Sequence, residues 1–134
     1  MTPIPTVGVI CFRGDEVLII QRGKAPRLGD WSIPGGRLEW DEAVRACALR
    51  ELMEETGVRA ELLGLVDVLD GFFGEGKHYV LIDYAARWIE GEPVAGDDAA
   101  DARFVPVAEA IAMVQWETTK QVIRDAWEQF GSKL

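Results

Sequence analysis

Cysteine and histidine are scarce in this chain, and it has no long apolar run. Its two cysteines, Cys11 and Cys47, are too few to build a disulfide framework, so we expect reduced thiols in a hydrophobic core. No segment approaches the ~18 consecutive apolar residues that a membrane-spanning helix needs. The first residues also lack the basic and apolar regions of a signal peptide. These absences predict a protein that is not inserted in a membrane, with a cytoplasmic location.

Lysine and arginine are also few in comparison with aspartate and glutamate. The chain has 14 Lys and Arg against 23 Asp and Glu, which gives a formal net charge of −9 at pH 7. A broad nucleic-acid surface normally needs a basic patch, so the composition argues against extended nucleic acid as a partner. A small anionic molecule would have to be bound by a metal ion and a few well-placed cations, because the field of the whole protein does not attract it.

Apolar sequence is abundant and is arranged as one domain. Hydrophobic residues make up 49% of 134 residues, and no repeat, linker or low-complexity tract divides residues 1–134. The pattern predicts a hairpin of strands 5–13 and 16–21, a short strand at 31–33, a helix with Asp41 as its N-cap and Gly57 at its end, strands near 60–70, 77–88 and 102–105, and helices at 107–114 and 117–130. Periodicity alone indicates an α/β or α+β fold.

Three glutamates in the first of these helices carry the functional signal. Glu51, Glu54 and Glu55 have the spacing i, i+3, i+4, so a helix places them on one face. They repel one another near a helix C-terminus, at a cost of a few tenths to ~1 kcal/mol each. A compensating cation would explain the arrangement, and hard carboxylate oxygens suit Mg²⁺ or Mn²⁺. The alternative is a solvated face with i,i+4 ion pairs. We disfavour it because the apolar residues around this helix predict that it is largely buried.

The segment of residues 36–58 resembles the Nudix box, which is a glycine, five residues, a glutamate, seven residues, and then Arg-Glu-aliphatic-x-Glu-Glu-x-Gly-aliphatic. Every defined position is filled, by Gly36, Glu42, Arg50, Glu51, Leu52, Glu54, Glu55, Gly57 and Val58. The preceding Pro-Gly-Gly is the usual lead-in of that family. A match at all nine positions is far more specific than a lone GxGxxG. The resemblance implies an αβα sandwich with a mixed β-sheet between helices.

The resemblance also implies a reaction, the hydrolysis of a nucleoside diphosphate linked to another group X. Glu51, Glu54 and Glu55 would hold Mg²⁺ or Mn²⁺, with the Gly35 backbone carbonyl as a further ligand, and one carboxylate would be the general base. In this family that role moves between a box glutamate and an acid elsewhere, so Glu51 is a first choice. Arg50 would orient a glutamate through a charge-assisted hydrogen bond.

Further candidates lie outside the box. Asp98 belongs to residues 97–104, which resemble the family's acidic loop, and it is a candidate metal ligand, with turn formation as the alternative. Arg22 and Arg27 are candidates for a phosphate clamp, because the planar guanidinium group can bind phosphate through two hydrogen bonds.

Two aromatic residues are candidates for stacking on a base. Trp31 and Phe73 have suitable side chains, although such residues in strands usually belong to the core. The single histidine, His78, has no partner pattern and favours a structural or surface role.

Markers outside the box bear on the substrate. The ADP-ribose branch of the family often has a proline past the box, where this chain has Phe72-Phe73-Gly74. The markers of diadenosine polyphosphate and coenzyme A hydrolases are not evident either. The absence of these markers favours a (deoxy)nucleoside triphosphate pyrophosphohydrolase, with an ADP-ribose or nucleotide-sugar pyrophosphatase as the alternative. A non-catalytic nucleotide-sensing domain would be expected to lose box glutamates. A homodimer through an exposed Trp88 or Trp116 is a further hypothesis, with core placement as its alternative.

Overall fold

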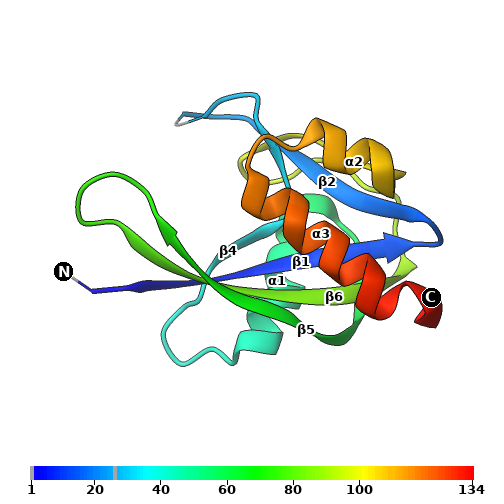
Figure 1. Cartoon of the computed structure of the whole chain (residues 1–134), viewed down its shortest axis with the longest axis horizontal. Coiled ribbons are helices and arrows are strands. Elements are labelled where there is room, and N and C mark those ends of the chain that lie inside the picture. Colours follow the sequence, from blue (N-terminus) through cyan, green and yellow to red (C-terminus); the bar gives the residue numbers. More distant parts are fainter. Residues whose placement is uncertain (1, 26) are drawn as a thin grey trace.

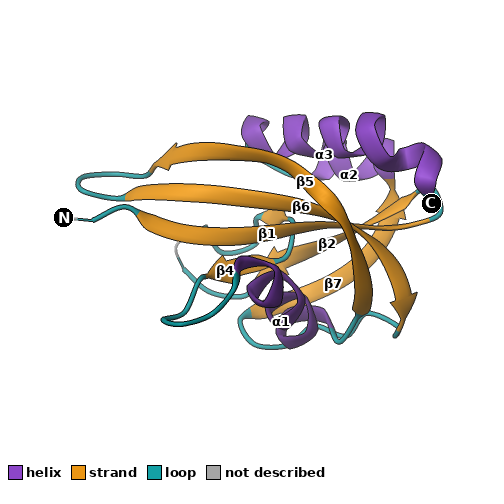
Figure 2. Cartoon of the chain, turned by 90° about the horizontal axis from the view of Figure 1, so that it is seen from below, coloured by secondary structure: helices purple, strands orange, loops and turns teal. Residues whose placement is uncertain are grey.

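The protein consists of one mixed β-sheet between layers of helices. The computed structural model describes residues 2–25 and 27–134. The elements in chain order are β1 (Ile4–Arg13), β2 (Glu16–Arg22), β3 (Trp31–Ser32), β4 (Gly35–Arg37), α1 (Val44–Thr56), β5 (Arg59–Phe72), β6 (His78–Glu90), β7 (Ala99–Pro106), α2 (Val107–Met113), α3 (Glu117–Phe130) and a 3₁₀ turn, η1 (Gly131–Lys133). Figure 1 shows their course, and in Figure 2 α1 covers one face of the sheet while α2 and α3 cover the other. The predicted αβα sandwich is therefore confirmed.

The first strand is central and changes partners along its length. The strand order is β3-β2-β1-β6-β5, with β4 paired to β1 and β7 paired to β2. Most of β1 runs parallel to β6. By contrast, β2 pairs with β1 only at the last residues of β1, Phe12 and Arg13. The first half of β1 pairs instead with β4, where Val7 is opposite Gly36 and Gly8 is opposite Gly35. This pairing brings the Pro-Gly-Gly segment next to α1.

An apolar cluster is packed on each face of the sheet. Successive side chains of a strand point to opposite faces, so Val9 and Cys11 belong to the cluster under α1, and Ile10 and Phe12 belong to the cluster under α2 and α3. Cys47 of α1 joins the first cluster, and both cysteines are free and buried. Burial raises the pKa of Cys11 to about 12, so this group stays a neutral thiol.

The start of α1 differs from its prediction. The helix begins at Val44 with Ala43 as the N-cap. Asp41 has a φ of 62°, in the left-handed region, whereas an N-cap residue has extended backbone. Asp41 is therefore not the cap. The predicted end is confirmed, because Gly57 adopts the left-handed conformation and its N–H donates to the Met53 carbonyl.

The prediction that α1 is largely buried is wrong for one side of the helix. Leu49 is 39% exposed and Met53 is 47% exposed, whereas Leu52 is fully buried. The reason is that the sheet covers only one side of α1, and no further layer lies beyond it (Figure 2). The burial of Glu51 and Glu55 therefore comes from the sheet and not from an all-round core.

The remaining elements follow the predicted order. The hairpin turns at Gly14, whose φ is 62°, and β7 begins at Ala99, earlier than predicted. The helices α2 and α3 match their predicted ranges, and Trp127 on α3 is 37% exposed. Trp88 and Trp116 are half-buried, so neither is the exposed patch that the homodimer hypothesis required. Within the described residues, no helix is both long and apolar enough to cross a membrane.

Candidate active site

Two glycines of β4 allow the backbone to touch both β1 and α1. A methyl group on Gly35 would lie 2.5 Å from the Val7 carbonyl oxygen, and one on Gly36 would overlap the Glu51 carboxylate. Only glycine avoids these contacts. The Gly35 N–H also donates to Glu55 Oε1 at 2.7 Å. The Pro-Gly-Gly lead-in therefore lets two box glutamates lie directly against the strand.

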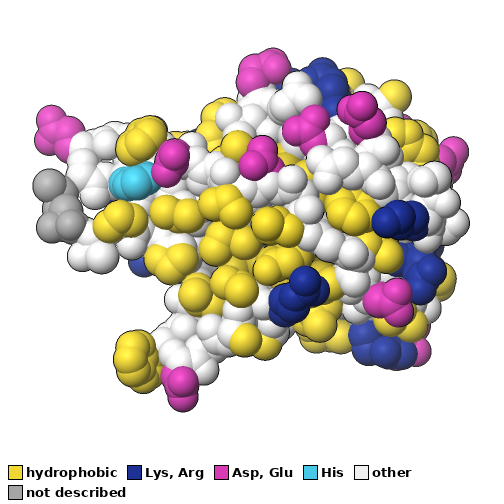
Figure 3. Space-filling view, turned by 60° about the horizontal axis from the view of Figure 1, so that its bottom comes forward, with side chains coloured by type: hydrophobic (Ala, Val, Ile, Leu, Met, Phe, Trp, Pro, Cys, Tyr) yellow, Lys and Arg dark blue, Asp and Glu magenta, His cyan; other side chains and the backbone are white. Residues whose placement is uncertain are grey.

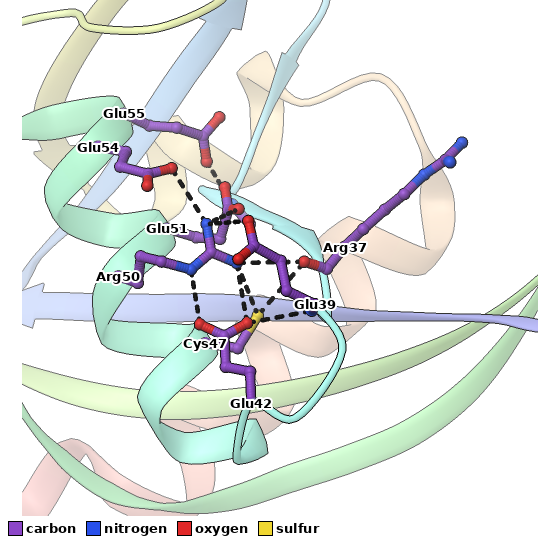
Figure 4. A network of polar contacts seen from close by, with 9 residues as sticks. Arg37, Glu39, Glu42, Cys47, Arg50, Glu51, Glu54 and Glu55 are labelled. Atoms are coloured by element: carbon purple, nitrogen blue, oxygen red, sulfur yellow. Dashed lines mark hydrogen bonds and ion pairs between the residues drawn. The ribbon is translucent and has the colours of Figure 1, made fainter.

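Arg50 lies at the centre of the carboxylate cluster, as Figure 4 shows. Its Nε and Nη2 atoms donate to the two oxygens of Glu42 at 2.6 and 3.0 Å, which is a bidentate contact. Its Nη1 atom donates to Glu51 at 2.8 Å and to Glu54 at 3.1 Å. The hydrogen bonds from Arg50 lower the pKa of Glu42 to about 2. One guanidinium thus offsets much of the repulsion among these acids.

The three box glutamates differ in burial, and burial governs their protonation. Glu51 and Glu55 are each 9% exposed, whereas Glu54 lies at the surface. Burial raises the pKa of Glu55 to about 8, against the opposing effect of a backbone N–H, and neighbouring carboxylates raise it further. Burial also raises the pKa of Glu51, against the lowering effect of the adjacent guanidinium. Negative charge at Glu55 is therefore poorly compensated by the described residues.

The donor chemistry of this centre fits Mg²⁺ or Mn²⁺, because hard carboxylate oxygens from α1 converge beside β4. The side chains are not a ready ligand set. Among the described residues, no three His, Cys, Asp or Glu side chains are grouped closely enough to hold an ion. Arg50 bonds to both Glu51 and Glu54, so these contacts have to open for an ion to bind there. Gly35 contacts the centre through its N–H, and its carbonyl remains a predicted ligand.

The loop of residues 94–98 brings two aspartates to the C-terminal end of α1. The Gly96 N–H donates to the backbone carbonyl of Glu55 at 2.9 Å, which holds the loop against the helix. Asp97 and Asp98 both raise the pKa of Glu55, so both are close enough to interact with it. The structure thus places the predicted acidic loop beside the box.

The two aspartates of this loop differ in their partners. The Asp98 carboxylate lies 2.8 Å from Lys24 Nζ, a contact that competes with a role as metal ligand. Asp97 raises the pKa of both Glu51 and Glu55. Asp97 is not among the site residues predicted from the sequence, where its only signal is that it is the first of two adjacent aspartates.

The residues predicted to bind substrate are divided among three places. Arg22 ends β2 beside the start of β7, next to the aspartate loop. The guanidinium of Arg27 lies 5.2 Å from the centre of the Phe73 ring, so these two candidates come together. Trp31 is half-buried in β3, with the guanidinium of Arg103 5.1 Å from the centre of its ring. Trp31 also packs against the margin of the apolar cluster that lies under α2 and α3.

Comparison with known proteins agrees with this arrangement. The family model described as NUDIX domain matches residues 2–126. The chain belongs to the NUDIX family. Within that family, residues 36–58 are its Nudix box, and in the structure they form the end of β4, the turn that follows, α1 and the first residue after its C-cap.

The relatives of this NUDIX chain carry several names. An ADP-ribose pyrophosphatase from Methanocaldococcus jannaschii is 33% identical over 103 residues, which are 76% of this chain and 61% of that protein. A Mycobacterium tuberculosis protein with the provisional name 8-oxo-dGTP diphosphatase 2 is 36% identical over 75% of this chain and 71% of its own length. The crystal structure of a MutT NUDIX hydrolase from Burkholderia pseudomallei has a TM-score of 0.79 at 27% identity, and the match covers 93% of this chain and 98% of that one. This chain therefore spans less than two thirds of the M. jannaschii protein.

Proposed function

We propose that the chain is a Mg²⁺- or Mn²⁺-dependent NUDIX hydrolase that cleaves the pyrophosphate linkage of a nucleoside diphosphate linked to X. The proposed substrate is a (deoxy)nucleoside triphosphate, and the products are the nucleoside monophosphate and pyrophosphate. The observation that carries this proposal is the complete set of box carboxylates against the β4 glycines, with Glu51 and Glu55 buried. Burying carboxylates destabilises the fold, and perturbed carboxylates cluster at sites where their charge is used.

The contacts of each glutamate support its proposed role. Glu51 is the proposed general base that accepts a proton from the attacking water, because burial raises its pKa and its carboxylate lies directly against the β4 backbone at Gly36. Glu51, Glu54 and Glu55, with the Gly35 carbonyl, are the proposed metal ligands. The metal, when bound, supplies charge neutralisation at the phosphate oxygens and makes water more acidic.

The residues around the glutamates have proposed roles in binding. Arg22 and Arg27 are the proposed phosphate clamp, since the summed charge of −9 leaves few cations to meet a polyphosphate. Asp98 is the proposed supplementary metal ligand, once its ion pair with Lys24 opens. Trp31 is the proposed stacking residue for the base, using the part of its side chain that remains exposed.

Two observations favour a nucleoside triphosphate over ADP-ribose. The M. tuberculosis relative named for 8-oxo-dGTP is 36% identical, and residues 72–74 lack the proline that often marks the ADP-ribose branch. ADP-ribose hydrolysis is the second candidate, supported by the 33% identity to the M. jannaschii ADP-ribose pyrophosphatase. A nucleotide sensor without activity is disfavoured because all the box glutamates are retained.

The test is product release from a substrate panel, with Mg²⁺ and with EDTA. The panel holds common and oxidised (deoxy)nucleoside triphosphates, ADP-ribose, nucleotide sugars and diadenosine polyphosphates. We expect metal-dependent release of pyrophosphate and a nucleoside monophosphate from one group of triphosphates. Dominant cleavage of ADP-ribose would overturn the substrate assignment, and no metal-dependent turnover by folded protein would overturn the enzyme assignment.

The variant Glu55→Gln, measured in the same assay, tests the assignment of the box glutamates as metal ligands. We expect Glu55→Gln to lower kcat by about 100-fold or more, because it removes a charge that a metal needs, while folding is kept. The matched control is Glu128→Gln, which alters an exposed glutamate on α3, far from the box in sequence and on the opposite face of the sheet. Wild-type turnover by Glu55→Gln would contradict the metal assignment.

A further inference from the structure

A fully exposed tryptophan projects from the loop between β4 and α1. Trp40 is 97% exposed, the largest exposed fraction among the large hydrophobic side chains that the structure describes. A tryptophan side chain buries about 150–250 Å² when it is covered, so leaving it in water forgoes a large stabilisation. Single exposed apolar residues are ordinary on protein surfaces. What distinguishes Trp40 is how its loop is held and what lies beside it.

The loop that carries Trp40 is held in one conformation by hydrogen bonds. The Glu39 N–H donates to the Glu42 carboxylate at 3.1 Å, and the Glu42 N–H donates to the Glu39 carbonyl at 3.2 Å. The same carboxylate is fixed by its bidentate contact with Arg50. Asp41, next to Trp40, has a φ of 62°, which is a left-handed conformation that few residues other than glycine adopt. An ordered turn therefore presents Trp40 to solvent, so a partner that covers it pays little ordering entropy.

An apolar surface lies on the same side of the molecule as this loop. Leu65 of β5 is opposite Tyr84 of β6, which belongs to the apolar cluster under α1. Val68 is opposite Ile82, which packs against the same cluster, as does Leu38. Paired residues point to the same face of a sheet, yet Leu65 is 46% exposed and Val68 is 51% exposed. This part of the apolar face therefore extends beyond the cover of α1.

The shape of this surface is hollow. Figure 1 shows the β5–β6 hairpin and the loop between β4 and α1 projecting on the same side of the molecule. In Figure 3 hydrophobic side chains gather across the centre of the visible face, and the surface is hollowed between two projections. We call the exposed apolar residues of this region the Trp40 face, and they are Leu38, Trp40, Leu65, Val68 and Ile82. One face thus carries both a projecting aromatic group and a hollow with an apolar floor.

The charges around the Trp40 face are complementary between two copies of the chain. Trp40 has an acidic neighbour on each side, Glu39 and Asp41. Arg45, in the first turn of α1, is exposed, and its guanidinium lies 5.3 Å from the centre of the Tyr84 ring. Neither Asp41 nor Arg45 forms an ion pair within the described residues. A two-fold axis through this face can place Asp41 of each copy against Arg45 of the other.

We propose that the Trp40 face forms a homodimer in which Trp40 of each copy fills the hollow of the other. An interface around a two-fold axis needs one surface that is complementary to itself, and this face has both the projecting group and the hollow. Two tryptophans at about 150–250 Å² each supply roughly a quarter of the 1,200–2,000 Å² that a specific interface buries. The local charge match is needed because a net charge of −9 repels two copies. The proposal goes beyond the proposed function and does not depend on the substrate.

Sedimentation velocity at protein concentrations from about 2 to 200 µM tests the dimer. We expect wild type to be dimeric at the upper end of this range. Trp40→Ser should weaken the dimer by about 100-fold or more, because each dimer loses two central tryptophans, while circular dichroism shows an unchanged fold. The matched control is Val94→Ser. Val94 is 70% exposed, but its N–H donates to the carbonyl of Thr56 at the opposite end of α1, so this variant should remain dimeric.

The variants Asp41→Asn and Arg45→Gln test how the two copies are paired. Asparagine accepts the left-handed backbone, so Asp41→Asn removes the charge and keeps the turn. Each variant should weaken the dimer by roughly threefold to tenfold, and the double variant should weaken it no more than either alone. Three results would overturn the proposal: a monomeric wild type at about 200 µM, which would leave the face to a different partner, a dimer that survives Trp40→Ser, or additive losses from the two charge variants.

Discussion

Arg50 shows how a single residue changes the meaning of a sequence pattern. The spacing of Glu51, Glu54 and Glu55 indicates that these acids need compensating positive charge, which the sequence analysis assigned to a metal ion. In the structure part of that need is met from within the box, because the Arg50 guanidinium contacts Glu51 and Glu54 as well as Glu42. An ion at this centre would therefore compete with Arg50. Arg50 does not contact Glu55 in the described structure, so the uncompensated negative charge is concentrated at Glu55.

Asp83 makes stability depend on pH in a direction that can be measured. Asp83 lies on β6, and burial raises its pKa to about 7 in the folded protein against 3.8 ordinarily, so the unfolded chain loses this proton first as pH rises. The stability associated with Asp83 is thus complete below about pH 4 and is lost between pH 4 and pH 7, at about 1.4 kcal/mol for each unit of pKa difference. Asp83→Asn should match wild type near pH 4 and exceed its free energy of unfolding above pH 7.

Urea unfolding at pH 4, 5.5, 7 and 8 checks this expectation. The difference between Asp83→Asn and wild type isolates Asp83, because Glu51 and Glu55 contribute a slope of the same sign to both proteins. A difference that does not change with pH would contradict the assigned shift.

At the scale of elements, the site depends on one helix and one very short strand that meet without side chains between them. The strand β4 has three residues, and its two glycines let α1 approach closely enough for Glu51 and Glu55 to reach its backbone. Gly57 serves a different purpose, since it ends α1 in the left-handed conformation and has open space around it. Gly36 and Gly57 both belong to the box, and the structure separates their roles.

Gly36→Ala and Gly57→Ala should therefore have different effects. Gly36→Ala should remove most of the activity, because the new methyl group displaces the Glu51 carboxylate. Gly57→Ala should destabilise the protein by about 1 kcal/mol through left-handed strain, with kcat nearly unchanged. Thermal unfolding and turnover of both variants check this, and equal losses of activity would contradict the separation.

At the scale of the whole molecule, charge opposes the proposed substrate. The net charge of −9 is spread over the chain, while the cations near the box include Lys24, which is paired with Asp98, and Arg50, which is paired with box glutamates. Figure 3 shows one face on which hydrophobic side chains gather at the centre, with acidic and basic groups around them. An anionic nucleotide therefore approaches against the overall field and depends on local groups.

Ionic strength tests this balance. Raising monovalent salt from about 20 to 150 mM shortens the Debye length to about 8 Å and screens the long-range repulsion. We expect kcat/KM for a triphosphate to rise severalfold at constant free Mg²⁺, mainly through KM. A steep fall with salt would show instead that attraction by local cations outweighs the net charge.

What the amino-acid sequence determined by itself is the family, the order of the elements and the identity of the acidic cluster. These properties depend on the spacing of residues that are close together in the chain, and the sequence shows that spacing directly. Examples are the i, i+3, i+4 glutamates, the capping Gly57 and the apolar runs of β1 and β2. Only the tertiary structure decided that Arg50 makes its bidentate contact with Glu42, that one side of α1 is exposed, and that Asp97 and Asp98 reach Glu55. It also decided that Asp83 lies over Gly8. Each of these depends on which strands pair and in which register, and pairing between distant segments leaves no mark in the spacing of either segment.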